Sequence, residues 1–309
     1  MSALQERAED YLRVRRALGH NLADAGRLLP RFVAYLEQTG AETITLEAAL
    51  AWVQQPAAAP ISSVWMRRMA VVRGFARHMS GLDPNTEVPP LGLVSFRRSW
   101  RPPFIYSAED VTALMSEVTR SIPSPLRAAT FTTLIGLLAA TGMRVGEAIR
   151  LGRSDVDFAE GLVVVRASKF NKSREVPVTV STAEALADYA KTRDRWQPAP
   201  KASTFFVSMR GTPVIYGDFG TFFRRLLAST GVGATSTIRP RIHDLRHSFA
   251  VHTLIRWYRS GADVGPLLPR LSTYLGHRDP TSTYWYLSAV PDLLALAAER
   301  LEVSQEARP

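Results

Sequence analysis

The chain has no cysteine among its 309 residues. Disulfide bonds, thiolate nucleophiles and cysteine-ligated zinc are therefore excluded. Its longest apolar run, residues 128–141, is shorter than the roughly 20 residues that a membrane-spanning helix needs. The opening MSALQERAED also lacks the basic start and apolar block of a secretory signal. We therefore expect a cytoplasmic protein with no passage through a membrane.

Lysine is scarce, although the chain as a whole is strongly basic. Lysine and arginine together number 38 against 28 acidic residues, which gives a formal net charge of +10. Lysine stands only at positions 169, 172, 191 and 201, so 38 minus 4 leaves 34 arginines. A planar guanidinium can hold two phosphate oxygens at once, and this charge balance favours a polyanionic partner. Coding bias or solubility would give the same composition, so the positions of the arginines must decide.

A proline-rich stretch separates two differently patterned parts of the chain. Residues 1–80 carry apolar side chains at the three- and four-residue spacing of amphipathic helices. Residues 81–104 lose this period and contain five prolines. Hydrophobic residues make up 46% of the chain, so both flanking parts can bury a core. We predict a helical domain over 1–80, a basic linker over 81–104 and a mainly α-helical domain over 105–309 with one small antiparallel sheet.

The first part is expected to hold helices near 22–36, 46–55 and 62–79. Pro30 should kink or restart the first of these, because proline removes a helical donor. Thr45 is the expected cap of the second. The helix over 62–79 and the linker bear seven arginines outside the apolar stripe, which we expect to contact a nucleic-acid backbone, with a merely solvated face as the alternative. They are Arg67, Arg68, Arg73, Arg77, Arg97, Arg98 and Arg101.

The second part should begin with a helix that Ser107 and Asp110 cap. A helix over 126–140 is apolar on nearly all sides and should be buried at the centre. Strands are expected at 162–166 and at 176–180, where Pro177 confines the strand to a sheet edge, with a possible further strand at 204–207. A helix capped by Ser181 and Glu184 should run to about 194. Further helices are expected at 218–229, 243–258, 264–275 and 291–302.

Polar and reactive side chains concentrate in three segments of this second part. Residues 140–151 place Arg144 at a helix start just beyond a glycine turn, with pairing to Glu147 as the purely structural alternative. Residues 167–178 form a hairpin whose tip bears Lys169 and Lys172. Residues 242–250 and 275–287 supply the remaining candidates, which are His243, Arg246, His247, His277, Tyr284 and Tyr286.

A zinc site is one alternative for part of this set. His243 and His247 stand four residues apart, which is the spacing of a zinc-binding pair on a helix. However, Asp244 occupies the place where such a motif has glutamate, and Arg246 would put a cation beside the metal. We therefore predict no metal site.

Taken together and in order, these residues resemble the signature of the tyrosine site-specific recombinases, also called the phage integrase family. The family includes the Xer resolvases and transposon integrases. The matching series is Arg144, Lys169, His243, Arg246, His277 and Tyr286. The likeness covers roughly residues 105–290, and the helical first part is more loosely similar to that family's core-binding, SAM-like domain. Ser168 and Phe170 replace the glycines that often flank the family's lysine, so Lys172 stays an alternative to Lys169. Tyr284 stays an alternative to Tyr286 as the nucleophile.

The resemblance implies an enzyme that breaks and rejoins DNA strands through a 3′-phosphotyrosine bond. Two arginines and His277 would stabilise charge on the phosphoryl group, while Tyr286 attacks with His243 as its base. A lysine would protonate the departing 5′ oxygen.

The resemblance also implies the partners. These are double-stranded DNA with specific sites and three further copies of the chain, giving a tetramer on two DNA sites. The segment 291–301 is a candidate docking helix. No cofactor is expected. The resemblance also implies that the protein acts at the nucleoid or belongs to a mobile element. A type IB topoisomerase and a catalytically silent DNA-binding regulator are the alternative functions.

Overall fold

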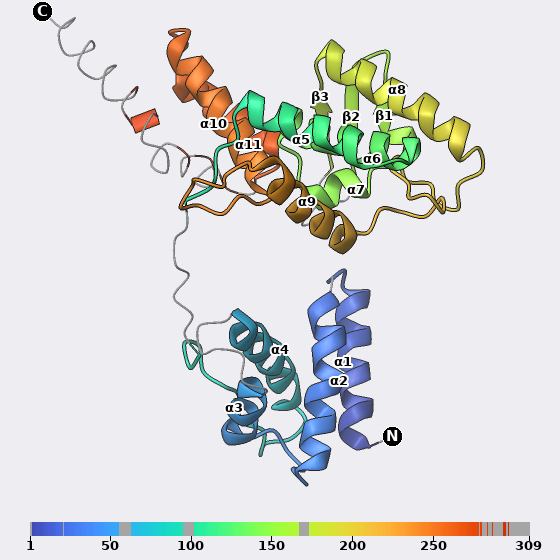
Figure 1. Cartoon of the computed structure of the whole chain (residues 1–309). Coiled ribbons are helices and arrows are strands. Elements are labelled where there is room, and N and C mark those ends of the chain that lie inside the picture. Colours follow the sequence, from blue (N-terminus) through green and yellow to red (C-terminus); the bar gives the residue numbers. More distant parts are fainter. Residues whose placement is uncertain are drawn as a thin grey trace, which may run out of the picture. The chain divides into compact units, whose positions relative to one another are not determined.

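The structure is a computed structural model that divides the chain into two compact units, Met1–Trp100 and Arg101–Pro309 (Figure 1). The described residues are 2–20, 22–55, 63–94, 102–166 and 173–277, together with Asp279, Thr283, Tyr286, Leu293, Leu294 and Leu296. None of the helices in these ranges has the length and apolarity to cross a bilayer.

Among its described residues, the first unit contains four helices, α1 (Ala3–Ala17), α2 (Ala23–Gln38), α3 (Leu46–Gln54) and α4 (Ser63–Met79). Their facing sides bury Phe32, Val33 and Phe75 completely. Thr45 caps α3 as predicted, since its Oγ1 accepts from the Ala48 N–H at 3.1 Å. Of the kink or restart predicted at Pro30, the restart is wrong, because α2 continues through this residue, while the kink stays a prediction.

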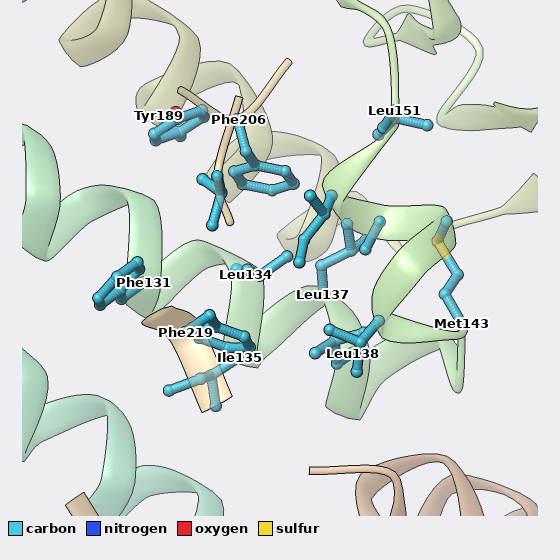
Figure 2. Close-up of a cluster of buried hydrophobic side chains, with 14 of the residues drawn as sticks. Phe131, Leu134, Ile135, Leu137, Leu138, Met143, Leu151, Tyr189, Phe206 and Phe219 are labelled. Carbon is cyan, nitrogen blue, oxygen red and sulfur yellow. The ribbon is translucent and has the colours of Figure 1, made fainter. Parts of the chain in front are cut away.

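The second unit is built around one buried helix. Helix α6 (Pro125–Thr141) contacts α5 (Ala108–Ser121), α7 (Val145–Ile149), α8 (Val180–Trp196) and α10 (Asp244–Arg259). Figure 2 shows Leu134, Ile135 and Leu138 of this helix among aromatic side chains that come from elsewhere in the unit. The predictions of a central buried helix and of the Ser107–Asp110 cap are confirmed. The unit also contains α9 (Tyr216–Thr230), α11 (Val264–Leu275) and the short 3-10 helix η1 (Arg153–Asp155).

The sheet has three antiparallel strands in the order β1 (Val156–Asp157), β2 (Leu162–Val165) and β3 (Arg174–Pro177). Val165 pairs with Arg174 and Val163 with Val176, so Pro177 lies on an edge strand as expected. The mainly helical fold with one small antiparallel sheet is therefore confirmed.

Several local predictions in this region were wrong. Strand β3 begins two residues earlier than expected, and the segment 204–207 makes only isolated bridges. Helix α8 is capped by Thr179 instead of Ser181, because Thr179 is extended and its Oγ1 accepts from the Thr182 N–H. The cap is thereby set two residues earlier than the sequence pattern indicated. The expected helix over 291–302 lies outside the described residues apart from Leu293, Leu294 and Leu296.

Candidate active site

Arg144 stands at the beginning of α7, directly after a sharp turn. Gly142 makes this turn with φ of +62°, and a Cβ there would lie 2.7 Å from the Phe249 ring, so only glycine fits. The Arg144 Nη2 donates to the carbonyl oxygen of Gly276 at 2.8 Å, and its Nη1 donates to Glu147 Oε1 at 2.6 Å. The guanidinium is therefore fixed from two sides before any ligand arrives.

Glu147 is the buried anion that holds two arginines together. Its side chain is 3% exposed and pairs with Arg144 and with Arg174 of β3, whose Nη2 lies 2.8 Å from Glu147 Oε2. Burial by itself would raise the pKa of Glu147, but the bonds and charges of Arg174 and Arg144 outweigh burial and lower it to about 2. Glu147 is therefore ionised throughout the neutral range.

Arg174 also ties the sheet to the turn after α11. Its Nε donates to the Tyr274 carbonyl oxygen at 2.9 Å, and the Tyr274 hydroxyl donates to the Pro177 carbonyl at 3.0 Å. A Cβ at Gly276 would lie 2.7 Å from Arg174 Nη1. The base of the β2–β3 hairpin is therefore held against the loop that supplies Gly276 and His277.

Arg246 is the second cation of the site and lies on α10. It is 3% exposed, and it donates from Nη1 to the Gly142 carbonyl and from Nη2 to the Leu275 carbonyl, each at 2.8 Å. Burial, followed by the neighbouring Arg144 charge, lowers the pKa of Arg246 to about 10. The two arginines are thus anchored to the same pair of turns, which brings their charges close together.

Tyr286 lies beside this pair of cations. It is 2% exposed and packs against α10 and α11. Its hydroxyl is 3.1 Å from His247 Nδ1, and Arg246 is near enough to hydrogen-bond it. Burial raises the pKa of Tyr286, while Arg246 and then Arg144 oppose that rise. The phenol is therefore protonated at neutral pH in the DNA-free protein.

His277 follows α11 and its ring stacks on that of Tyr286, with centroids 6.3 Å apart. Its Nδ1 is 2.8 Å from the hydroxyl of Thr283, a residue with no exposed surface. Burial, followed by Arg246 and Arg144, lowers the pKa of His277 to about 4. The ring is therefore neutral at pH 7.

His243 precedes α10 and is open at the surface. Its ring stands edge-on to that of His247, with centroids 4.9 Å apart. The surrounding protein atoms, and then the Arg246 cation, lower its pKa. Like His247 and His277, it has a pKa below the ordinary value of histidine, first because the protein shields the ring from water and then because of positive neighbours.

The zinc alternative is not supported by the groups around these histidines. Asp244 is fully buried and engaged by Arg241, which contacts it through the backbone N–H at 2.9 Å and through Nε at 3.1 Å. Within the part of the chain that the structure describes, no three His, Cys, Asp or Glu side chains are grouped as a metal would need.

The structure brings five of the six predicted site residues together, namely Arg144, His243, Arg246, His277 and Tyr286. Lys169 and Lys172 lie outside the described residues, as does Tyr284. Sequence reasoning missed Arg174, and it named His247 among the candidates but gave it a specific role only in the zinc alternative. The pairing of Glu147 with Arg144 had appeared as an alternative to a functional site, whereas in the structure Arg144 makes this ion pair and also lies within the candidate site.

The arginines of α4 that we predicted to contact a nucleic-acid backbone fall into two kinds. Arg68 donates to the Val53 carbonyl at 3.2 Å and stacks over Trp52, with its Cζ 5.4 Å from the ring centroid. Arg73 donates to the Pro89 and Pro90 carbonyls at 2.8 and 2.9 Å. Arg67 and Arg77, in contrast, are exposed. The linker arginines Arg97, Arg98 and Arg101 lie outside the described residues.

Comparison with known proteins agrees with this site. A model of the phage integrase family matches residues 105–291, and the chain therefore belongs to this family. The chain is 42% identical over 314 residues to y4rB of Sinorhizobium fredii, which bears an integrase/recombinase name, with 100% of both chains covered. It is 29% identical over 303 residues to the tyrosine recombinase XerD of Bradyrhizobium diazoefficiens, covering 92% of this chain and 91% of that protein.

Solved structures show the same fold. XerA recombinase aligns with a TM-score of 0.51 and 22% identity, covering 99% of both chains. The Tn1549 transposon integrase, in complex with a circular intermediate DNA, aligns with a TM-score of 0.64 and 17% identity, covering 95% of this chain and 99% of that one. The prediction of a tyrosine recombinase that acts in site-specific DNA recombination is confirmed by the family and these relatives, and neither alternative function is favoured.

Proposed function

We propose that this recombinase cuts DNA by attack of the Tyr286 hydroxyl on a backbone phosphorus, leaving a 3′-phosphotyrosine and a free 5′-hydroxyl. The observation that carries the proposal is the position of the phenol, which lies against Arg246 and His247 and beside the ring of His277. The bond energy is kept in the phosphotyrosine, so a second 5′-hydroxyl can reverse the step without a nucleotide cofactor.

Arg144 and Arg246 are proposed to bind the two non-bridging phosphate oxygens. Each guanidinium has five N–H donors, and the anchoring bonds to Glu147, Gly276, Gly142 and Leu275 use only some of them. Because the anchors fix both groups in advance, little reorganisation is needed when negative charge develops in the transition state.

His277 is proposed to donate a third hydrogen bond to the phosphoryl group. A neutral ring carries a single proton, and the Thr283 hydroxyl at 2.8 Å can donate to Nδ1. That arrangement places the ring proton on Nε2, the atom available for donation to an oxygen. Thr283 thus acts as a positioning residue for His277.

Lys169 is proposed as the general acid for the departing 5′ oxygen, with Lys172 as its substitute. Both belong to the segment between β2 and β3, whose base Arg174 ties to the site. Because Arg174 ties the base of this hairpin to the site, we expect a lysine of the segment to protonate the leaving group while the rest of the site holds the phosphate. His243 remains a candidate for proton transfer to or from Tyr286.

DNA binding is proposed to use a helical domain over 1–80, a linker over 81–104 and the catalytic domain over 105–309, acting in the cytoplasm at the nucleoid. The net charge of +10 and the exposed Arg67 and Arg77 support a clamp that contacts phosphates. Affinity should therefore fall steeply between low and moderate salt. A flat response would contradict the clamp.

A tetramer on two DNA sites, docked through the segment 291–301, completes the proposal. Truncation after Ser288 is expected to leave binding to one site intact and to abolish assembly on two. Native gel shifts with one-site and two-site DNA measure both. Unchanged assembly of the truncated chain would contradict docking by this segment.

The proposed chemistry is tested by trapping the covalent intermediate. The protein is incubated in EDTA with nicked DNA carrying a candidate site, denatured and run on a gel that separates protein–DNA adducts. We expect an adduct with the natural chain and with Tyr284→Phe, and none with Tyr286→Phe. An adduct that persists in Tyr286→Phe would contradict the assignment of the nucleophile.

A further inference from the structure

We propose that His247 takes the proton from the Tyr286 hydroxyl during DNA cleavage and returns it during ligation. This inference rests on the proposed function and assigns a catalytic role to a residue outside the predicted set. The carrying observation is the 3.1 Å separation between His247 Nδ1 and Tyr286 Oη, which is within the reach that a general base requires. The two rings also touch edge to face, with centroids 5.5 Å apart.

Burial of the phenol makes a protein acceptor necessary. Tyr286 is 2% exposed, so its proton has little direct access to bulk water. Among the described side chains that the structure places against the phenol, Arg246 bears no acceptor atom, and His277 turns its Nδ1 to Thr283 at 2.8 Å. His247 instead directs a ring nitrogen at the hydroxyl. To accept, this ring must carry its own proton on Nε2.

His243 provides an outlet for the proton. It lies one helical turn before His247, with the ring centroids 4.9 Å apart, and it is exposed where His247 is half-buried. A proton that arrives on His247 can therefore be relayed towards solvent past His243. On this account the two histidines have different functions, with His247 in contact with the nucleophile and His243 at the surface.

Burial, together with the charges around His247, keeps the base inactive without DNA. Burial, followed by His243, Arg241, Arg246 and His277, lowers its pKa to about 3, while the pKa of Tyr286 is raised. The ring is thus unprotonated and ready at neutral pH, yet transfer is unfavourable in the free protein. A DNA phosphate between Arg144 and Arg246 would offset these positive charges and raise the affinity of His247 for a proton. Substrate binding therefore switches the base on.

The step balances in atoms and charge. As Tyr286 Oη forms its bond to phosphorus, its proton moves to His247 Nδ1, and the bond from phosphorus to the 5′ oxygen breaks. The 5′ oxygen takes a proton from the lysine of the hairpin and leaves as a hydroxyl. In ligation a 5′-hydroxyl attacks the phosphotyrosine and loses its proton to that lysine, while His247 returns a proton to the departing phenolate.

The test compares single-turnover cleavage of nicked site DNA by full-length His247→Ala, His247→Asn and His243→Asn. Asparagine can accept a hydrogen bond from the phenol but cannot take its proton, so it separates positioning from proton transfer. At pH 7 we expect both His247 variants to lose about 10²–10⁴-fold in rate. His252→Ala on the same helix is the matched control. The Nε2 atom of His252 contacts the carbonyl oxygen of Tyr106, which belongs to none of the proposed catalytic groups. The rate of His252→Ala should be unchanged.

Two further conditions distinguish a base from a residue that only supports the fold. The deficit of His247→Asn should shrink as pH rises towards the ionisation of tyrosine. It should also shrink when Tyr286 is replaced by 3,5-difluorotyrosine, whose phenol ionises at lower pH. A rate deficit of His247→Asn that stays constant under both conditions would overturn the inference. Cleavage by His247→Asn at the rate of the natural chain would overturn it as well. A loss confined to His243→Asn that responds to both conditions would assign the base to His243 instead.

The outcomes separate this inference from the proposed function. If Tyr286→Phe still forms a covalent adduct, the proposed function fails and the rates say nothing about its base. If adduct formation needs Tyr286 but His247→Asn cleaves at the natural rate, only the role of His247 fails. DNA affinity and circular dichroism of each variant confirm that folding and binding are intact.

Discussion

At the scale of single residues, the site is a surplus of buried positive charge organised by backbone carbonyls. Arg144 and Arg174 pair with one carboxylate, Glu147. Arg246 lies close enough to feel the charges of all three, so three positive charges and one negative leave a net charge of +2 in this group. The remaining anchors are carbonyl oxygens of the turns at Gly142 and Leu275–Gly276, which orient the cations without neutralising them. The unbalanced charge is what a phosphate diester can complete.

Removing the one carboxylate should therefore be costly. Glu147→Gln keeps the shape of the side chain but leaves Arg174, whose side chain is 10% exposed, without its charged partner. We expect a loss of about 3 kcal/mol in the free energy of unfolding, as is typical when one member of a buried pair is removed. Denaturant unfolding measures it. Asp188→Asn, which breaks the exposed pair with Lys191, is the control and should change stability little; equal effects would contradict a structural role for Glu147.

The residues proposed to react could be nominated from the sequence, whereas the residues that hold them could not. The proposed nucleophile, the two proposed phosphate-binding arginines and His277 stand in a fixed order along the chain, and that order alone suggested them. Arg174 is 27 positions from Glu147 and 100 from Tyr274, and its importance follows only from the pairing of β3 with β2 and the packing of α11 on β3. No local pattern of residues encodes those contacts.

At the scale of elements, α4 shows that an arginine outside an apolar stripe need not face solvent. The period of the helix correctly gave its buried side, with Met69, Val72 and Ala76 inside. It could not show that Arg68 reaches the last carbonyls of α3, or that Arg73 reaches two carbonyls of the following segment. These bonds depend on how neighbouring elements pack. Arg68 and Arg73 therefore hold the first unit together, whatever contacts they also make with DNA.

Adjacent arginines of α4 should therefore respond differently to substitution. Arg67→Ala removes an exposed cation and is expected to weaken DNA binding, with a fall of about 0.9 in the slope of log affinity against log salt for one lost phosphate contact. Its thermal stability should not change. Arg68→Ala removes the bond to Val53 and the stacking on Trp52, and is expected to destabilise the protein by about 1–2 kcal/mol. Salt titrations and denaturant unfolding measure the two effects, and identical behaviour would refute the distinction.

Pro30 shows how tertiary packing can override a local rule. An interior proline costs a helix about 3 kcal/mol relative to alanine, and this cost motivated the predicted interruption of α2. However, the helix buries Leu28, Leu29, Phe32, Val33 and Leu36 on one side, while Pro30 itself is exposed. Burial of several large apolar side chains outweighs one missing hydrogen bond.

Pro30→Ala should consequently stabilise the first unit. The substitution restores a backbone donor in the middle of α2 and removes the clash of the ring with the preceding turn. We expect a gain of about 1–3 kcal/mol in the free energy of unfolding, measured by denaturant, with DNA affinity retained. A loss of stability would mean that the proline ring makes a contact that α2 requires.

At the scale of the whole molecule, we expect the buried histidines of the candidate site to make the DNA-free protein sensitive to acid. Folding lowers the pKa of His247 from 6.5 to about 3 and that of His277 from 6.5 to about 4. The unfolded chain therefore binds more protons than the folded one over this range, so the stability that neutral histidines contribute is present above about pH 6.5 and is lost as pH falls. Glu147, with its pKa lowered from 4.5 to about 2, adds a further loss below about pH 4.5.

Denaturant midpoints taken from pH 7 down to pH 4 should thus fall steadily, and most of the fall above pH 5 should come from the histidines. His247→Asn removes one of these histidine titrations and is expected to flatten the slope between pH 6.5 and 5, even if it lowers stability at pH 7. Bound duplex DNA should flatten it as well, because the phosphate offsets the cations that keep both rings neutral. A midpoint that stays constant over this range, or the same slope in His247→Asn, would show that the histidines of the site are not coupled to folding. The positive charge of the site would then not lower the stability of the DNA-free protein measurably as pH falls.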